Sequence, residues 1–457
     1  MPMKRIAIIG SGITALARAW QFKQQGHECV VLETTDTIGG AIQSYREGAY
    51  LAEEGPNSIQ VHSAEVDAFL KSIPDFADRV IVASTAANKR FIVRDGQPHA
   101  VPVGPLTAIT TPLWSFGGKL RVLKEPFIPA IEPETEESAA DFVRRRLGDE
   151  LYRYAINPLI GGIYAGDPQQ LSLRYAFPKL YALEQNHGGM IRGAIAKMRA
   201  ARGSDAPQVD KRIISFKDGL AELPQLLAAA LGNAVHTRVS INSIHSTDAG
   251  WTIKWNGSEH IYDEVLLTAP AHALAKLPLG EAIQQSLQPL AAIDYPPVSV
   301  LSLAFKRSEV AHPLDGFGVL VPECEGRSIL GALFPSTLFA GRAPADEVML
   351  TVFVGGERQP ELAVADTDAV MATVLPELNK LLGVSGAPTF VHHRHWPRAI
   401  PQYKIGYGSL LAQMDAVEAK FPGLKLAGNY RDGISLSDCI EAAVIPSSGR
   451  FVETGIT

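Results

Sequence analysis

The sequence has few cysteines, no long apolar run and no excess of positive charge. Its three cysteines, Cys29, Cys324 and Cys439, are far apart and form no CxxC pair, which argues against a dithiol or zinc motif and favours a reducing compartment. No window reaches 18 consecutive apolar residues, so no membrane-spanning helix is expected. With 42 lysines and arginines against 48 aspartates and glutamates, the net charge of −6 excludes a typical nucleic-acid-binding protein.

Motifs of hydrolases and metalloenzymes are also missing. There is no Ser-His-Asp signature and no HExxH. The single candidate metal site is the run His392, His393 and His395, of which the last two share one face of a strand; a polar strand edge is the favoured interpretation, so no metal is expected. The first motif begins so early that no signal peptide is expected, which predicts a cytoplasmic protein. A length of 457 residues predicts two or three domains.

The first clear motif is a nucleotide-binding pattern in residues 4–33. An apolar strand leads into a glycine turn, a helix and a second strand that ends at Glu33. Gly10 permits the sharp turn, Gly12 lets a pyrophosphate approach the helix N-terminus, and Ala15 is small enough for close helix packing. Glu33 is suited to accept hydrogen bonds from ribose hydroxyls. The predicted dinucleotide site therefore comprises Gly10, Ser11, Gly12, Ile13, Thr14, Ala15 and Glu33.

The C-terminal segment distinguishes between the two possible dinucleotides. Residues 424–450 read as a strand, a glycine loop and a small-residue helix. FAD is long and needs a second helix start near its ribityl chain and ring, which a nicotinamide enzyme seldom provides. The cofactor is therefore predicted to be FAD, contacted here by Gly428, Gly433, Ile434, Ser435 and Leu436.

Between these ends the sequence alternates helical and strand patterns. Helices are predicted over 64–73 and 138–156, with Arg144, Arg145 and Arg146 on a solvated face. GSDAP at 203–207 reads as a linker. The predicted strands are 236–241, 251–255, 263–268, 298–305, 316–321, 329–334 and 348–354. The uncharged stretch Val101–Phe116 is interpreted as a buried loop with short helical turns, and the alternative is a shallow dip into a membrane interface.

Several motifs together resemble a known family. GSGITALARAW, Glu33, IGGAI, EEGPNS, FKDGLAEL, DEVLLTAP and GNYRDGISLSDCIEAA are similar to the flavin amine oxidase superfamily. Within it, NPLIGGIYAGDPQQLS, GFGVLVP and AIPQY resemble the protoporphyrinogen oxidase family. The resemblance implies an α/β fold with a discontinuous Rossmann-like domain for noncovalent FAD, a mixed-sheet substrate domain and a helical lobe that rests on the membrane. The implied boundaries are 1–75, 205–272 and 395–457 for FAD, 76–100 and 273–394 for substrate, and 101–204 for the lobe.

The resemblance also implies roles for single residues. Gly39, Gly40, Gly55, Pro56, Asn57, Ser58, Val239 and Trp396 join the cofactor site, with Val239 at adenine and Gly55–Ser58 along the ring. Leu301, Phe317 and Phe334 bracket a flat apolar substrate, and Arg90 pairs with a propionate, as Arg94 could also do. Ala41 and Tyr407 depart from the family pattern, which usually has a basic or bulky residue and a histidine there.

The implied reaction depends on the cofactor, and no catalytic side chain is expected. A methylene bridge of protoporphyrinogen IX gives a hydride to flavin, and three such steps yield protoporphyrin IX in haem biosynthesis, with oxygen as acceptor and hydrogen peroxide as product. A peripheral position on the inner face of the membrane is a further expectation. Three alternatives stay open: oxidation of coproporphyrinogen III, oxidation of a small amine, against which aliphatic Leu301 argues, and a nonenzymatic flavin- or porphyrin-binding protein. The oligomeric state is not predicted.

Overall fold

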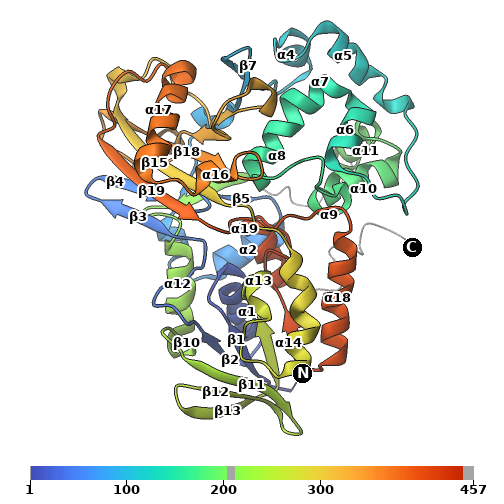
Figure 1. The fold of residues 1–457 in the computed structure, drawn as a ribbon, viewed down its shortest axis with the longest axis vertical. Helices are drawn as coiled ribbons and strands as arrows, with labels where there is room; N and C mark the ends of the chain where they lie inside the picture. Colours follow the sequence, from blue (N-terminus) through green and yellow to red (C-terminus); the bar gives the residue numbers. More distant parts are fainter. Residues whose placement is uncertain (1, 203–210, 446–457) are drawn as a thin grey trace.

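A five-stranded parallel sheet forms the nucleotide-binding part of the protein (Figure 1). The computed structural model describes residues 2–202 and 211–445. The strand order is β10-β2-β1-β14-β20, and every pair is parallel. The strands are β1 (Arg5–Ile9), β2 (Glu28–Leu32), β10 (Val235–His236), β14 (Glu264–Leu267) and β20 (Leu424–Leu426). These strands come from three separate stretches of chain, because the intervening segments leave the sheet and return to it.

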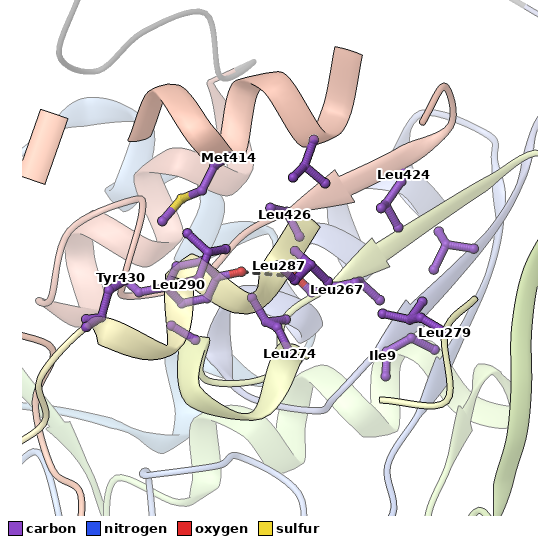
Figure 2. Packing of buried hydrophobic residues seen from close by; sticks show 14 of the residues in the cluster. Ile9, Leu267, Leu274, Leu279, Leu287, Leu290, Met414, Leu424, Leu426 and Tyr430 are labelled. Carbon is purple, nitrogen blue, oxygen red and sulfur yellow. Dashed lines mark hydrogen bonds between the residues drawn. The ribbon is translucent and has the colours of Figure 1, made fainter. Parts of the chain in front are cut away.

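Helices cover both faces of this sheet. On one face α1 (Ile13–Gln24) packs with α12 (Glu222–Leu231), α2 (Ala64–Ser72) and α19 (Leu436–Val444). On the other face α18 (Tyr407–Lys420), α13 (Ala271–Leu274) and α14 (Glu281–Leu287) bury apolar side chains against it. Figure 2 shows this second core, in which Leu274, Leu287 and Leu290 approach Leu267 and Leu426.

That packing corrects one predicted boundary. Residues 273–292 were assigned to the substrate domain, but α14 and the following turn η5 (Gln288–Ala292) lie on the nucleotide-binding sheet. The reason is that the leucines and the isoleucine of these two elements are almost completely buried. They fill the core that covers β14 and β20.

A seven-stranded mixed sheet forms the second part of the molecule. Its order is β19-β15-β18-β17-β16-β7-β8, antiparallel except for the β16–β7 pair. The strands are β7 (Phe91–Arg94), β8 (Gln97–Ala100), β15 (Val298–Lys306), β16 (Gly318–Leu320), β17 (Gly331–Leu333), β18 (Glu347–Gly355) and β19 (Phe390–Trp396). The long helix α17 (Thr367–Leu382) packs on one face, while the other face meets the nucleotide-binding part.

Helices make up the third part, between residues 105 and 202. They are α4 (Pro105–Thr110), α5 (Phe116–Leu123), η2 (Glu125–Phe127), α6 (Ala139–Leu147), α7 (Asp149–Leu151), η3 (Tyr152–Ile156), α8 (Asn157–Tyr164), α9 (Leu173–Ala176), α10 (Pro178–His187) and α11 (Met190–Arg202). The single helix predicted over 138–156 is divided, because Gly148 has a φ of 93° and ends α6. Residues 152–156 continue as π-helix.

Small elements complete the fold. They are the hairpin β3 (Ser44–Glu47) and β4 (Tyr50–Glu53), the sheet of β5 (Ile59–Val61), β6 (Val80–Val82) and β9 (Arg212–Phe216), the sheet of β11 (Ile241–Thr247), β12 (Gly250–Trp255) and β13 (Ser258–Tyr262), and the short helices α3 (Phe76–Arg79), α15 (Pro335–Leu338) and α16 (Pro360–Ala363). The strand predicted over 236–241 is interrupted, since Arg238 has a φ of 55°. The predicted linker 203–207 lies outside the described residues.

Two surface predictions change in the helical part. Arg146 is fully buried, between Glu125 at 2.7 Å and Glu184 at 2.5 Å, and is no part of a solvated face. For Val101–Phe116 the favoured interpretation, a buried loop, is wrong for Leu106, Ile109 and Phe116, because these apolar side chains are exposed. It is correct for Leu113, which is buried.

Candidate functional site

The glycine turn after β1 forms an open cradle at the start of α1. Gly10 has a φ of 106°, and a Cβ there would lie 2.7 Å from Thr268 Oγ1, so only glycine fits. At Gly12 a Cβ would meet nothing within 4 Å, which leaves room beside the backbone. Gly12 is the N-cap of α1 and offers no side-chain cap, so the first amides of the helix face outward. This geometry suits a pyrophosphate.

Glu33 organises the neighbouring ribose and adenine region. Its carboxylate accepts hydrogen bonds from Ser11, at 3.0 Å from the backbone nitrogen and 2.7 Å from Oγ, and from Thr35. The amide of Val239 donates to the carbonyl of Glu33 at 2.9 Å. The structure therefore brings together Ser11, Glu33 and Val239, three residues that the sequence predicted for one end of the cofactor.

The loop Gly55–Ser58 passes close to Ala41, which directly follows Gly39 and Gly40. A Cβ on Gly55 would collide with the backbone carbonyl oxygen of Ala41, so this close approach is made by the backbone of Ala41. Trp396 Nε1 donates to the carbonyl of Glu54 at 2.6 Å, which fixes Trp396 beside this loop. Asn57 donates to Gly55 at 3.1 Å, while its Oδ1 is buried without a partner in the described part of the chain.

The C-terminal loop forms the second helix start. Tyr403 donates to the carbonyl of Asn429 and accepts from the amide of Gly433 at 3.1 Å. Ser435 caps α19 by accepting from Asp438. Tyr407, where the family usually has histidine, is buried and donates to the carbonyl of Tyr430 at 2.6 Å, so it supports this loop from behind.

Arg18 and Asp432 are two residues near this loop that sequence reasoning missed. Burial lowers the pKa of the Arg18 guanidinium on α1, against the opposing charge of Asp432. Asp432 accepts from the amide of Gly428 at 2.9 Å. Two features of the sequence could have indicated them. Asp432 is an acid directly before the predicted cofactor glycine Gly433, and Arg18 is a basic residue about one turn into α1.

The residues present fit FAD. The open space at Gly12 suits a pyrophosphate, Glu33 suits a ribose, and the unpartnered Oδ1 of Asn57 suits a polar edge of the flavin ring. Ile434 and Leu436 lie at the start of α19, on the same side of the sheet as α1. Two helix starts within one core therefore give the extended site that an FAD molecule needs.

The predicted substrate residues fall into two groups. Arg90 is exposed and its guanidinium carbon lies 5.2 Å from the ring centre of half-buried Phe317. Leu301 and Phe334 have no exposed surface and belong to the core beneath α17. A direct contact of Leu301 and Phe334 with the substrate stays a prediction, and their packing does not support it. The aliphatic character of Leu301 therefore no longer argues against a small amine as substrate.

Arg94 has a different role from the one considered for it. Its side chain lies 2.7 Å from Glu150 Oε1 and its guanidinium carbon lies 4.5 Å from the ring centre of Tyr154. Arg94 thereby fastens β7 to the helical part, and it is not available to a substrate carboxylate in this arrangement.

The exposed face of α8 carries apolar side chains that sequence reasoning missed as candidate substrate contacts. Leu159, Gly162 and Ile163 lie on this face, and a Cβ on Gly162 would come within 2.6 Å of Leu320 on β16. Leu320, Leu333 and Phe353 are partly exposed on the sheet face opposite α17. The i, i+4 spacing of Leu159 and Ile163, with small Gly162 between them, was the available signal.

Two of the histidines of β19 point to opposite faces of the strand. His392 Nε2 lies 2.8 Å from Glu54 Oε1, whereas His393 points to the other face and lies 2.8 Å from Ser299 Oγ. β19 is an edge strand of the sheet. Among the described residues, the three histidines are not in a group that could hold a metal ion.

Comparison with known proteins identifies the family. The family model "Flavin containing amine oxidoreductase" matches residues 11–445. Protoporphyrinogen oxidase 2, chloroplastic/mitochondrial, of Arabidopsis thaliana is 32% identical over 96% of this chain and 92% of its own length. Coproporphyrinogen III oxidase of Bacillus subtilis is 26% identical over 96% of each chain. The solved structure of a candidate protoporphyrinogen oxidase from Exiguobacterium sp. 255-15 superposes with a TM-score of 0.79 at 26% identity, covering 97% and 98%.

These matches extend over nearly the whole chain and agree with the two helix starts described above. The predicted cofactor and reaction class are confirmed. This chain belongs to the flavin-containing amine oxidoreductase family and is an FAD-dependent oxidoreductase.

Proposed function

We propose that this protein oxidises protoporphyrinogen IX to protoporphyrin IX. The observation that carries the proposal is the joint presence of an FAD cradle, an apolar surface on α8 and β16, and an exposed arginine, Arg90, near that surface. A porphyrinogen is a broad apolar macrocycle with carboxylates at its edge, so it needs both kinds of contact. The similarity to protoporphyrinogen oxidases supports the same substrate.

Bound FAD supplies the electron acceptor for each two-electron step, and oxygen is the proposed final acceptor. The chain's own residues bind and orient the substrate. Arg90 holds a propionate through its planar guanidinium, and Phe317 beneath it supports the guanidinium by a cation–π contact. Leu159, Ile163 and Leu320 exclude water from the macrocycle. No described side chain is needed as a nucleophile.

Coproporphyrinogen III is the second candidate, since coproporphyrinogen III oxidases are also similar to the chain. The two substrates differ in that the second carries four propionates. The deciding experiment compares kcat/KM for both porphyrinogens, followed by porphyrin fluorescence. A higher value for protoporphyrinogen IX is expected. Turnover of neither substrate, in protein that carries FAD, would contradict the proposal and favour a small amine or a binding role.

Arg90→Ala tests the binding role. Loss of one charge-assisted contact is expected to raise KM by about 10- to 100-fold, the equivalent of about 1.5–3 kcal/mol, while FAD content stays unchanged. Lys89→Ala is the matched control, because Lys89 is an exposed neighbour that already pairs with Asp315. An unchanged KM for Arg90→Ala would remove it from the site.

We further propose that the protein lies peripherally on the inner face of a membrane. Seven exposed apolar side chains form what we call the apolar face: Val103, Leu106, Ile109, Phe116, Leu120, Leu123 and Phe127. They belong to α4, α5, η2 and the segment before α4, which Figure 1 shows at the upper end of the molecule. Among the helices that the structure describes, none has the length and apolar character to cross a bilayer. An apolar face of this kind suits shallow insertion.

A further inference from the structure

A row of polar side chains crosses the seven-stranded sheet. In the register of the sheet, Ser302 of β15 pairs with Thr351 of β18 on one side and with His392 of β19 on the other. Directly paired residues of antiparallel strands point to the same face, so the three side chains are consecutive neighbours. On its far side Thr351 pairs with Leu333, which is partly exposed on the sheet face proposed for the substrate.

This row faces the cofactor side of the sheet. Leu301 and Leu303 pack under α17, so Ser302 between them points the opposite way. Ala304, two residues further, packs against Ala52 of β4, and Val300, two residues back, packs in the cluster that contains Trp396. The row therefore lies beneath residues 52–54, directly before the Gly55–Ser58 loop.

The two hydroxyls of the row are buried and unpaired. Ser302 and Thr351 are each 1% exposed, and neither hydroxyl oxygen has a hydrogen-bond partner within residues 2–202 and 211–445. Buried hydroxyls without a protein partner are usually satisfied by ordered water. Facing Cβ atoms in such a pair are about 4.5–5.5 Å apart, a separation that one water molecule can bridge.

The other end of the row reaches an acid near the surface. His392 Nε2 lies 2.8 Å from Glu54 Oε1, and the imidazole stacks on Tyr45 with ring centres 4.0 Å apart. Glu54 is 15% exposed and also lies 3.7 Å from Arg394. Hydroxyl, water, imidazole and carboxylate groups in sequence are the components of a proton path.

We propose that Thr351, Ser302, His392 and Glu54 carry protons from the substrate side of the sheet to solvent, with ordered water joining the two hydroxyls and joining Ser302 to His392. This inference rests on the proposed function. Over three rounds, a C–H bond of each of three methylene bridges would break, and bound FAD would accept the hydrogen with both electrons. Each round also releases one proton: two of the three come from pyrrole N–H bonds and the third from a C–H bond of the fourth methylene bridge, and the electron pair stays on the macrocycle each time. The row carries these protons away, and an equal number is taken up when oxygen is reduced to hydrogen peroxide.

Removal of each hydroxyl tests the path. Ser302→Ala and Thr351→Val are expected to lower kcat for protoporphyrinogen IX by about tenfold. This decrease is smaller than the rate enhancement that a positioned proton-transfer group usually contributes. KM and the FAD absorption spectrum stay unchanged, and the solvent deuterium isotope effect on kcat increases. Thr351→Ser, which keeps the hydroxyl, restores kcat. Ser299→Ala is the matched control: Ser299 is a buried serine on the opposite face of β15 that donates to Ala363, and its loss leaves kcat and the isotope effect unchanged.

A second measurement does not depend on activity. A high-resolution crystal structure is expected to contain a water within hydrogen-bond distance of both hydroxyl oxygens, and this water is absent from Thr351→Val. The proposal is overturned if the parent protein oxidises the porphyrinogen and both hydroxyl variants keep its kcat and isotope effect, or if the space holds no water. A parent protein without porphyrinogen turnover overturns the proposed function instead, and the proton path with it.

Discussion

At the scale of single residues, the protein itself holds the side chain of Glu33, which is predicted to contact the ribose of FAD. Ser11 and Thr35 donate to its two carboxylate oxygens, and the backbone of Glu33 pairs with His236 and Val239. Asp432 in addition accepts a hydrogen bond from the amide of Gly428 in the C-terminal loop. Side chains that are ordered before the ligand arrives lose little conformational freedom on binding, which favours affinity for FAD.

Glu33→Gln is expected to weaken FAD binding while the fold persists. The amide keeps the shape of the side chain but loses the charge that strengthens its hydrogen bonds, a difference of about 1.5–3 kcal/mol. Titration of the FAD-free protein with FAD should show a Kd raised about 10- to 100-fold. Asp36→Asn, an exposed acid three residues further, serves as control and should keep the parental Kd. Equal Kd values for both variants would contradict a ribose contact for Glu33.

His312 gives the protein a pH-dependent stability. It lies against Phe91, with ring centres 5.0 Å apart, and against Phe334, and burial lowers its pKa below the ordinary value of about 6.5. The unfolded chain therefore takes up the proton first. As the pH falls through about 6.5 towards the folded pKa, the free energy of unfolding decreases.

His312→Gln should reduce this dependence. The expected result is a smaller decrease in melting temperature between pH 7.5 and pH 5.5 than in the parent protein, measured by thermal denaturation at both values. A variant with the parental decrease would show that other groups cause it.

At the scale of elements, helix α6 is fastened to its neighbours by buried charges. Arg146 is fully buried and lies 2.7 Å from Glu125 of η2 and 2.5 Å from Glu184 of α10, both also fully buried. Glu125 in addition accepts from the amides of Met190 and Ile191 at the start of α11. Three elements therefore meet at one guanidinium and a fourth binds its partner Glu125, which sets the position of η2 and of the apolar face beside it.

Arg146→Met should destabilise the protein by about 3 kcal/mol, because it leaves the buried carboxylate of Glu125 without a cation and leaves Glu184 only its pair with Arg145 at 3.0 Å. Arg144→Met, two residues earlier on the same helix, removes ion pairs at 3.4 and 3.8 Å that are open to solvent and should cost about 1 kcal/mol or less. Denaturation followed by circular dichroism compares the two. Similar losses in both variants would contradict a special role for the buried network.

At the scale of the whole molecule, three parts divide the work. The parallel sheet carries the predicted FAD site, the mixed sheet and α8 carry the apolar surface that we propose for the substrate, and the helical part carries the apolar face at the end remote from the parallel sheet (Figure 1). An apolar substrate that dissolves in lipid could enter from this end without crossing water.

Removal of the apolar face should release the protein from membranes. The triple change Leu106→Ser, Phe116→Ser and Phe127→Ser removes side chains that are 81%, 76% and 83% exposed. Cosedimentation with vesicles of mixed neutral and anionic lipids should fall strongly, while FAD content stays the same. Val82→Ser with Val364→Ser, which removes exposed apolar side chains from other elements, is the control and should sediment as the parent does. Unchanged sedimentation of the triple variant would contradict the membrane proposal.

The sequence alone determined the local features of this protein. Each of these features depends on the conformation of a few neighbouring residues, so a sequence pattern can predict it. Examples are the turn Gly10–Gly12, the acid Glu33 and the helix start at Ser435. The periodicity of 298–305 and 348–354 likewise predicted β15 and β18 to within one residue at each end. These features predicted FAD as the cofactor, whereas the reaction class came from the resemblance of longer motifs to a known family.

Only the tertiary structure decided which face each side chain presents and what covers it. Leu301 and Ser302 are adjacent, yet one lies in the core under α17 and the other beneath Ala52–Glu54. Arg146 reads as a surface residue until η2 and α10, far away in the sequence, enclose it. α14 joins the cofactor sheet because its leucines find their partners there. Burial is a property of contacts between distant segments, and no local pattern records those contacts.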